Sequence, residues 1–130
     1  MIIQGTIVPG LGEGKLLGFP TANLQLTPAS ERAPIGIYAA WINIDKRSSQ
    51  AGILVSGIYM ENGNLSRQEV YVLDFNGDLY GKELVVEVVQ KIRDVVSMVD
   101  IGGLKKMITN DIEKTRIILR LDRRLRESDN

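Results

Sequence analysis

The sequence predicts a mainly β protein, a small antiparallel barrel followed by one amphipathic α-helix. Short runs rich in β-branched and aromatic residues alternate with turn residues over about the first 90 positions, which is typical of five or six strands. Two Asn-Gly pairs stand between such runs. Asn-Gly favours tight hairpins because type I′ turns need positive φ at both central residues. In the last third the apolar spacing changes to three or four residues, as on one face of a helix.

The expected strands follow one another with short connections. The first covers residues 2–8 and is followed by a glycine-rich stretch, and later strands are expected at 37–44, 52–59, 69–75 and 84–89. We expect consecutive hairpins, and therefore an antiparallel meander that closes into a small barrel. The hairpin turns are predicted at the two Asn-Gly pairs, Asn62-Gly63 and Asn76-Gly77.

The helix is expected from about residue 103 to the low 120s, with Gly102-Gly103 marking its start. From about residue 120 the chain is basic, and cations suit a helix C-terminus. A nucleic-acid patch is disfavoured because no aromatic residues lie among these charges. The apolar stripe is predicted from Leu104, Met107, Ile108, Ile112, Ile118 and Leu121, and the basic tail consists of Arg120, Arg123, Arg124 and Arg126.

Length and charge suggest one domain covering residues 1–130. The 16 basic and 16 acidic residues cancel, so no overall field favours nucleic acid or an acidic membrane. No apolar run approaches the roughly 20 residues that cross a bilayer. Residues 1–5 have neither a basic region nor a cleavage site, which predicts a cytoplasmic protein. We expect it to act as a monomer, with no nucleic acid or membrane partner.

The chain contains neither His nor Cys. This excludes a Ser-His-Asp triad, a thiolate nucleophile and a zinc–thiolate site. Acid–base chemistry would therefore have to use carboxylates, Lys or Tyr. A bound metal would be a hard cation held by oxygen, such as magnesium or calcium.

The glycine-rich stretch contains Gly12, Gly14 and Lys15, which invites a phosphate-binding interpretation. The spacing fits neither the Walker loop nor the dinucleotide fingerprint, because Leu16 stands where the Walker Ser/Thr belongs and no βαβ pattern follows. Two interpretations stay open from the residues alone: a plain turn, and a loop whose backbone approaches a phosphate closely.

Pro20-Thr21-Ala22-Asn23 is more informative. Pro20 biases the chain toward an extended conformation, in which residues two apart point the same way. Thr21 and Asn23 would then offer two neutral oxygen ligands to one magnesium ion, which characteristically takes few protein ligands and completes its shell with water and phosphate. The alternative is a turn in which these side chains bond to their own backbone.

Two acidic residues lie on otherwise apolar faces. Strand alternation places Glu69 with Tyr71, Leu73 and Phe75, where burial would make it a plausible general base. A strand-end side chain directed into water is the alternative. Asp111 lies on the apolar stripe of the helix, where it either bonds to a buried group or lines a pocket.

Taken together, these segments resemble the riboflavin kinase (flavokinase) family in order and spacing over roughly residues 3 to 119. The resemblance implies a six-stranded antiparallel Greek-key barrel with a C-terminal α-helix. It also implies transfer of the γ-phosphoryl group of ATP to the 5′-hydroxyl of riboflavin, giving FMN and ADP. The segments that carry it are Gly12–Lys15, Leu17–Leu24, Gly36–Ala39, Glu69–Phe75, Asp78–Lys82, Lys91–Arg93 and Asp111.

The resemblance also implies roles for individual residues. Thr21 and Asn23 would hold Mg²⁺ and the nucleotide phosphates, and Glu69 would take the proton of the attacking hydroxyl. Arg93 and the residues after it would close over the flavin, with Asp111 helping to bind it. The remaining nucleotide-binding residues would be Gly12, Gly14, Lys15 and Tyr80.

Some positions depart from the family pattern. Glu13 stands where many relatives carry a basic residue, Tyr71 replaces a common His, and Met98 replaces a common Phe. The pattern of an FMN adenylyltransferase domain is not found, so either a stand-alone kinase domain or a domain excised from a longer protein is expected. Two alternatives remain: a non-catalytic flavin- or nucleotide-binding barrel, and a flavokinase that uses CTP.

Overall fold

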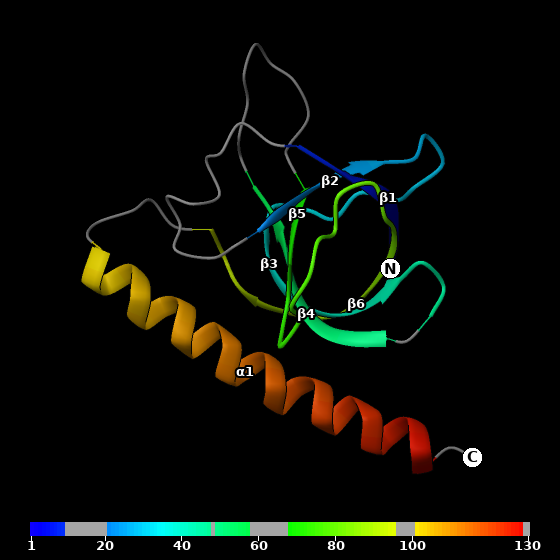
Figure 1. Cartoon of the computed structure of the whole chain (residues 1–130). Helices are drawn as coiled ribbons and strands as arrows, with labels where there is room; N and C mark the ends of the chain where they lie inside the picture. The colour runs from blue at the N-terminus through cyan, green and yellow to red at the C-terminus, as the bar shows by residue number, and fades with distance from the viewer. Residues whose placement is uncertain (10–20, 48, 58–67, 96–100, 129–130) are drawn as a thin grey trace.

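A computed structural model of the chain describes residues 1–9, 21–47, 49–57, 68–95 and 101–128. Within these residues six antiparallel strands close into a barrel in the order β1-β2-β5-β4-β3-β6, and helix α1 lies against its outside (Figure 1). The mainly β prediction with a C-terminal helix is therefore confirmed. The elements are β1 Ile2–Val8, β2 Ala22–Leu26, β3 Gly36–Ile44, β4 Ser49–Ser56, β5 Gln68–Val72, β6 Glu83–Arg93 and α1 Ile101–Ser128.

The strand order is a Greek key and not a simple meander. β3, β4 and β5 are neighbours in sequence and in space, but β6 returns to pair with β3 and β1. The prediction of a hairpin at Asn76-Gly77 is therefore wrong, because β5 and β6 do not pair with each other. Asn62-Gly63 lies outside the described residues. The closure of the twisted antiparallel sheet into a barrel, and not the Asn-Gly dipeptide, decides which strands β6 pairs with.

The tight turn lies between β3 and β4 and has no Asn-Gly pair. Asp45 and Lys46 have φ of 49° and 61°, and the N–H of Arg47 donates to the carbonyl of Ile44 at 3.0 Å. Positive φ at both central residues is the type I′ geometry that matches strand twist. Asp tolerates this left-handed region because its short polar side chain bonds locally.

β5 is shorter than the expected strand. It ends at Val72, and Asp74 adopts a φ of 57°, which turns the chain. The predicted alternation therefore holds for Glu69 and Tyr71, but Phe75 packs against the barrel interior and does not share their face. Conversely, β6 is longer than expected and extends to Arg93.

Alternate residues of each strand fill the barrel. The inner cluster includes Ile3, Leu24, Ile42, Leu54 and Val70, all buried. A second cluster of Ile37, Ile53 and Val55 lies on the outer face of the same strands, where Ile112 of α1 packs against it. Inside and outside of β3 and β4 are thus both apolar, which explains why these strands read as nearly continuous apolar runs.

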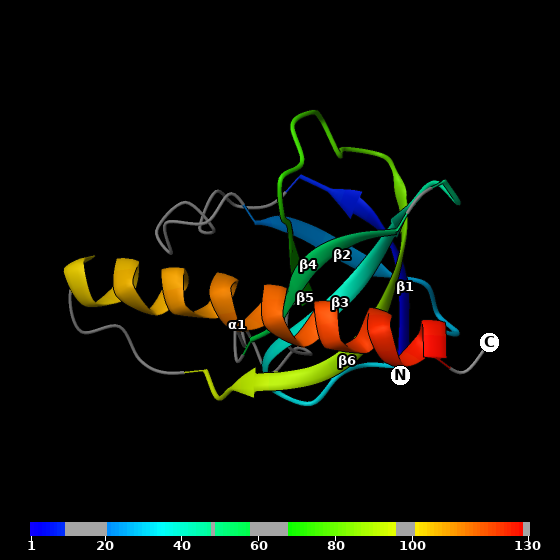
Figure 2. The same ribbon diagram turned by 90° about the horizontal axis from the view of Figure 1, so that it is seen from below.

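Helix α1 crosses the outer face of β3, β4 and β6 (Figure 2). It begins at Ile101 and ends at Ser128, so Gly102-Gly103 lies within its first turn and does not precede it. Its buried stripe is Asp111, Thr115 and Leu119, spaced four apart. The prediction that Leu121 belongs to that stripe is wrong, because its side chain is 53% exposed.

Polar contacts along α1 fix its position on the barrel. Trp41 Nε1 donates to Asp122 Oδ2 at 2.8 Å, and the guanidinium of Arg123 lies 5.0 Å from the centre of the Trp41 ring. Arg126 pairs with Glu87 of β6 and with Asp122. Part of the basic tail therefore joins the helix to the barrel, in addition to placing cations at the helix C-terminus as expected.

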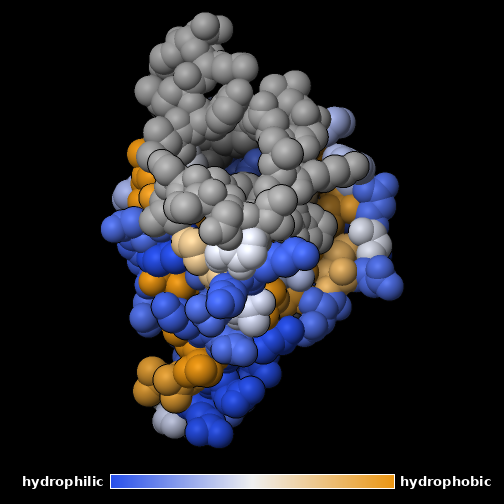
Figure 3. Space-filling model, turned by 90° about the vertical axis from the view of Figure 1, so that its left-hand side faces the viewer, coloured by the Kyte–Doolittle hydropathy of each residue, from blue (hydrophilic) through white to orange (hydrophobic). Residues whose placement is uncertain are grey.

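The face drawn in Figure 3 is hydrophilic along its lower part, where α1 lies, with scattered apolar patches. The exposed apolar side chains of the helix are Ile117, Leu121 and Leu125. Among the residues that the model covers, no helix combines the length and the apolar character needed to cross a bilayer.

Candidate functional site

Asn23 and Glu69 face each other on the outside of the barrel. In the strand register Asn23 lies opposite Val8 of β1 on one side and Glu69 of β5 on the other. Their sequence neighbours Leu24 and Val70 point into the core, so these two side chains point outward. Directly opposed residues of an antiparallel pair have Cβ atoms about 4.5–5.5 Å apart. The structure therefore brings together two of the predicted site residues.

Glu69 is buried although its strand ends nearby, since only 8% of it is exposed. Its other neighbour in the register is Val55 of β4, a member of the outer apolar cluster. The prediction that Glu69 lies on a desolvating apolar face is confirmed, and the alternative of a side chain directed into water is not. A buried carboxylate at the rim of a sheet is a group suited to accept a proton.

Thr21 directly precedes β2 and is half-buried. Its Oγ1 is buried and makes no hydrogen bond to any described residue. Buried hydroxyls usually find a partner, so among the described residues this oxygen is one that a bound ligand would satisfy. Asn23, two residues along, provides an amide oxygen on the same side in extended chain.

A hydroxyl and an amide oxygen side by side fit Mg²⁺, which takes neutral oxygen ligands and keeps several positions for water or phosphate. Among the described residues no three or more His, Cys, Asp or Glu side chains cluster as a metal site would. The Thr21 and Asn23 pair is therefore the donor set by which this chain could hold the ion.

On the inner face of β5, Gln68 fixes the strand that presents Glu69. Its Nε2 donates to Ser56 Oγ at 2.7 Å, and Ser56 Oγ donates to the carbonyl of Ala33 at 2.9 Å. All of these side chains are buried, and Gln68 Oε1 has no partner among the described residues. This network was not predicted from the sequence. The pattern that could have indicated it is Gln68 on the same strand face as Val70 and Val72, since a polar residue on an apolar face needs a buried hydrogen-bond partner.

An apolar strip leads away from Glu69 across the sheet. The register places Glu69 beside Val55, Val55 beside Ile37, and Ile37 beside Arg93. Strands lie about 4.8 Å apart, so three steps place Arg93 roughly 14 Å from Glu69 along the surface. Tyr71, Ile92 and Ile112 border the strip. Ile37 and Val55 are only 6% and 8% exposed, so the strip is covered in this structure, by Ile112 of α1 among others.

Arg93 and Asp111 form the polar end of the strip. Arg93 Nε lies 2.9 Å from Asp111 Oδ1, and Arg93 Nη2 lies 2.8 Å from Oδ2. The Arg93 side chain is 22% exposed and that of Asp111 only 2%. This bidentate pair explains why an acid can sit on the buried stripe of α1, and it joins the end of β6 to the helix.

Tyr80 lies on the other side of Asn23. The N–H of Gly81 donates to the carbonyl of Ile7 at 2.9 Å, so the segment that contains Tyr80 runs beside the end of β1. Tyr80 is 63% exposed. Of the described residues predicted to bind ligands, Tyr80 thus lies on the β1 side of Asn23, and Arg93 with Asp111 lies on the β4 side of Glu69. Gly12, Gly14, Lys15 and Met98 lie outside the described residues.

Two exposed ion pairs flank this surface. Arg116 of α1 bonds to both oxygens of Asp74, at 2.9 and 3.0 Å. These hydrogen bonds, with the attraction between the charges, hold the pKa of Asp74 below its usual value and raise the pKa of Arg116. Lys91 bonds to Asp94 next to Arg93, which likewise lowers the pKa of Asp94. Solvent screens these pairs, so their contribution to stability is small.

Comparisons with known proteins indicate the family of this chain. Residues 1–119 match the family described as Flavokinase, riboflavin kinase. The bifunctional riboflavin kinase/FMN adenylyltransferase of Pseudomonas fluorescens is 34% identical over 119 residues, covering 89% of this chain and 37% of the relative. The chain therefore spans little more than a third of that protein.

Solved structures show the same fold. A chain from Streptococcus pneumoniae described as a macrolide-efflux protein has a TM-score of 0.79 and 29% identity, over 88% of this chain and 38% of the other. The riboflavin kinase of Trypanosoma brucei has a TM-score of 0.68 and 24% identity, over 92% of this chain and 76% of its own. The predicted six-stranded barrel is thereby confirmed, and the family match over residues 1–119 shows that the chain belongs to the riboflavin kinase family.

Proposed function

We propose that this chain transfers the γ-phosphoryl group of ATP to the 5′-hydroxyl of riboflavin, with Mg²⁺, giving FMN and ADP. Membership of the family supports the reaction. The observation that carries the residue assignment is the juxtaposition of buried Glu69 with Asn23, next to a Thr21 hydroxyl that has no hydrogen-bond partner among the described residues. Phosphoryl transfer requires mainly positioning and charge neutralisation, so a small barrel without His suffices.

Glu69 is the group we assign as general base. Its carboxylate would accept the proton of the ribityl hydroxyl as that oxygen attacks the γ-phosphorus. The adjacent Gln68–Ser56 network keeps β5 in place, so the carboxylate is presented from a fixed strand. A base on a rigid element holds the reacting oxygen in line better than one on a free loop.

Thr21 and Asn23 are the residues we assign to the metal–nucleotide complex. Bound Mg²⁺ would neutralise charge on the phosphate oxygens. The Thr21 hydroxyl and the Asn23 amide oxygen would orient that complex next to Glu69. The segment that contains Tyr80 runs beside β1, on the side of Asn23 away from the apolar strip, and it would border the nucleoside.

The apolar strip from Val55 to Ile37 is the surface we assign to the flavin, whose binding would require the side chains that now cover the strip to move aside. Its length suits a three-ring system whose ribityl chain reaches Glu69 while the ring reaches Arg93. The pair of Arg93 and Asp111 would offer polar contacts at the ring end. All these groups come from one chain and the site needs no second copy, so we propose that residues 1–130 form one domain that acts as a monomer, in the cytoplasm where ATP is available.

The reaction itself is the first prediction. Riboflavin, ATP and Mg²⁺ should give FMN, and FMN with ATP should give no FAD, as measured by chromatography of the flavins. CTP in place of ATP and omission of the metal are the matched controls. If neither nucleotide gives FMN, the chain is a non-catalytic binding barrel. If FMN forms with CTP but not with ATP, the phosphoryl donor is CTP.

Replacement of Glu69 by Gln keeps the shape of the side chain but removes its ability to accept a proton. General base catalysis is worth about 10²- to 10⁴-fold, so kcat should fall within that range while riboflavin binding is nearly retained. Single-turnover kinetics would measure the chemical step. Glu113→Gln, an exposed position on α1, is the control. A Glu69 variant that keeps more than about half of kcat would exclude the base assignment.

The hydroxyl of Thr21 can be tested separately from its shape. Thr21→Val removes an oxygen that bonds to no described residue, so the free energy of unfolding should stay close to that of the original chain. The affinity for Mg²⁺–ATP should fall about tenfold, and Asn23→Ala should lower that affinity by a similar factor. Thr21→Ser should restore binding. Equal nucleotide affinity for the Val and Ser variants would contradict the ligand role.

The pair of Arg93 and Asp111 can be tested for a role beyond stability. Asp111→Asn should lower the free energy of unfolding by about 3 kcal/mol, because it leaves a guanidinium without its charged partner. The double variant Arg93→Met with Asp111→Leu should recover most of that stability, because apolar pairs of similar volume replace buried ion pairs well. Riboflavin binding should stay weakened in both, with Mg²⁺–ATP binding retained. Normal riboflavin affinity in the double variant would make the pair purely structural.

A further inference from the structure

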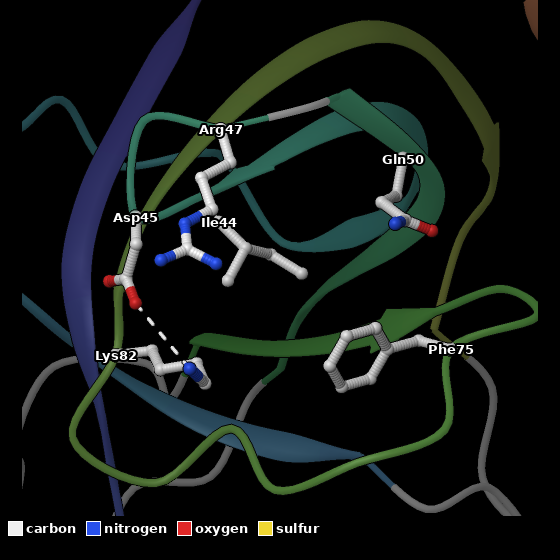
Figure 4. A pocket seen from close by; sticks show the side chains of 6 residues that line it. All are labelled: Ile44, Asp45, Arg47, Gln50, Phe75 and Lys82. Atoms are coloured by element: carbon white, nitrogen blue, oxygen red, sulfur yellow. Dashed lines mark ion pairs between the residues drawn. The ribbon is translucent and has the colours of Figure 1, made fainter.

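A pocket lies at the end of the barrel away from Glu69. It is lined by residues from the β3–β4 turn, the start of β4 and the segment between β5 and β6, and its volume is about 160 Å³. Glu69 begins β5 and Arg93 ends β6, whereas this pocket lies at the opposite ends of the same strands. Figure 4 shows its lining side chains: Ile44, Asp45, Arg47, Gln50, Phe75 and Lys82.

The charges in the pocket do not balance. Arg47 and Lys82 are cations, and Asp45 is the one anion among the lining residues. Asp45 is already engaged, since Oδ1 accepts the N–H of Glu83 at 2.9 Å and Oδ2 lies 3.5 Å from Lys82 Nζ. The lining therefore has a net charge of one positive unit, which a single negative charge would neutralise.

Arg47 carries the unbalanced charge. Its guanidinium points into the pocket (Figure 4) and forms no ion pair or hydrogen bond with any described residue. Its backbone is held by a hydrogen bond from its N–H to the carbonyl of Ile44 at 3.0 Å. A planar guanidinium with free donors fits the two oxygens of a carboxylate bidentately, which a point charge does not.

The uncharged part of the lining consists of Phe75, Ile44 and the polar side chain of Gln50. Phe75 turns its ring toward the interior and packs against the barrel core, and Ile44 is buried beneath it as part of the same cluster. An aromatic ring stacks or packs edge-on against another with centroids about 4.5–7 Å apart. A cavity of roughly 150 Å³ holds one benzene molecule, so this pocket has room for one six-membered ring.

The backbone around the pocket is held in uncommon conformations. Within the described residues the non-glycine positions with positive φ are Asp45, Lys46 and Asp74, and all three lie in the two segments that form the rim. At Asp45 and Lys46 they are those of the type I′ hairpin turn, and at Asp74 they turn the chain after β5. Here Asp45 and Lys46 also make the turn that directs Arg47 inward.

We propose that this pocket binds a small aromatic monocarboxylate. The carboxylate would accept hydrogen bonds from Arg47 beside the Lys82 ammonium, and the ring would pack between Phe75 and Ile44. None of the lining residues is assigned to riboflavin or ATP, although Tyr80, assigned to the nucleotide, belongs to the same connecting segment as Phe75 and Lys82. Tight binding in this pocket requires both parts of the ligand, the single negative charge and the flat apolar ring.

Benzoate is the probe, titrated into the full chain labelled with ¹⁵N. Amide shifts should change at residues 44–50 and 75–82 and should give a saturable Kd. Benzamide has the same shape without the charge, and acetate has the charge without the ring. Each should bind at least about tenfold more weakly, because a hydrogen bond to a charged group and the burial of a ring each exceed 1.4 kcal/mol.

Arg47→Gln should weaken benzoate binding about tenfold or more while leaving the unfolding midpoint unchanged, since the guanidinium bonds to no described residue. Arg47→Lys should be intermediate, and Arg120→Gln, an exposed position on α1, should bind like the original chain. Equal affinity for benzoate and benzamide would overturn the proposal. So would unchanged binding in Arg47→Gln, or shifts confined to the neighbourhood of Asn23 and Glu69.

Discussion

Closure of the strands into one barrel is the constraint from which the rest of the structure follows. Each strand must turn alternate side chains into a common core, and the others are then fixed on the outside by the same register. Leu24 and Val70 fill the core, so Asn23 and Glu69 are placed outside and opposite each other. A slip of one residue in β5 would bury Glu69 in the core and remove the site. The chemistry therefore depends on the register as much as on the residues.

Helix α1 covers apolar side chains on the outer face of the barrel that would otherwise face water. The outer faces of Ile37, Ile53 and Val55 are apolar and need a cover, which Ile112 supplies in part. The buried Asp111 would be costly there without Arg93, because an ionised carboxylate loses its hydration on burial. The bidentate pair offsets this cost and fixes the end of β6 against the helix. The proposed flavin surface thus lies where two elements meet, as small-molecule sites commonly do.

The two ends of the barrel differ in which side-chain groups lack a hydrogen-bond partner among the described residues. At the Glu69 end the structure holds oxygen atoms without partners among the described residues, on Thr21 and Gln68. At the other end the guanidinium of Arg47, an exposed cation, bonds to no described residue and lines a pocket together with Phe75 and Ile44. Oxygens suit a metal–phosphate complex, whereas a guanidinium suits an anion. One small fold can in this way present two sites of opposite chemistry, because Glu69 and the pocket lie toward opposite ends of the same strands.

Several features followed from the sequence alone. Period-two alternation identified Glu69 on an apolar face, and helical spacing placed Asp111 on the buried stripe, because both patterns are local and exact in their geometry. Barrel class, the first strand and the final helix followed for the same reason. The segments around Thr21, Asn23 and Glu69 were sufficient to indicate the family.

The tertiary structure alone decided the rest. The sequence placed a hairpin at Asn76-Gly77, but β6 pairs with β3 and β1, since closure of the barrel outweighs a local turn preference. It could not reveal that Arg93 is the partner of Asp111, that Gln68 supports β5 through Ser56, or that Arg47 and Phe75 share a pocket. These residues lie far apart in the chain, and no local pattern encodes a contact that exists only when strands from both halves of the barrel pair.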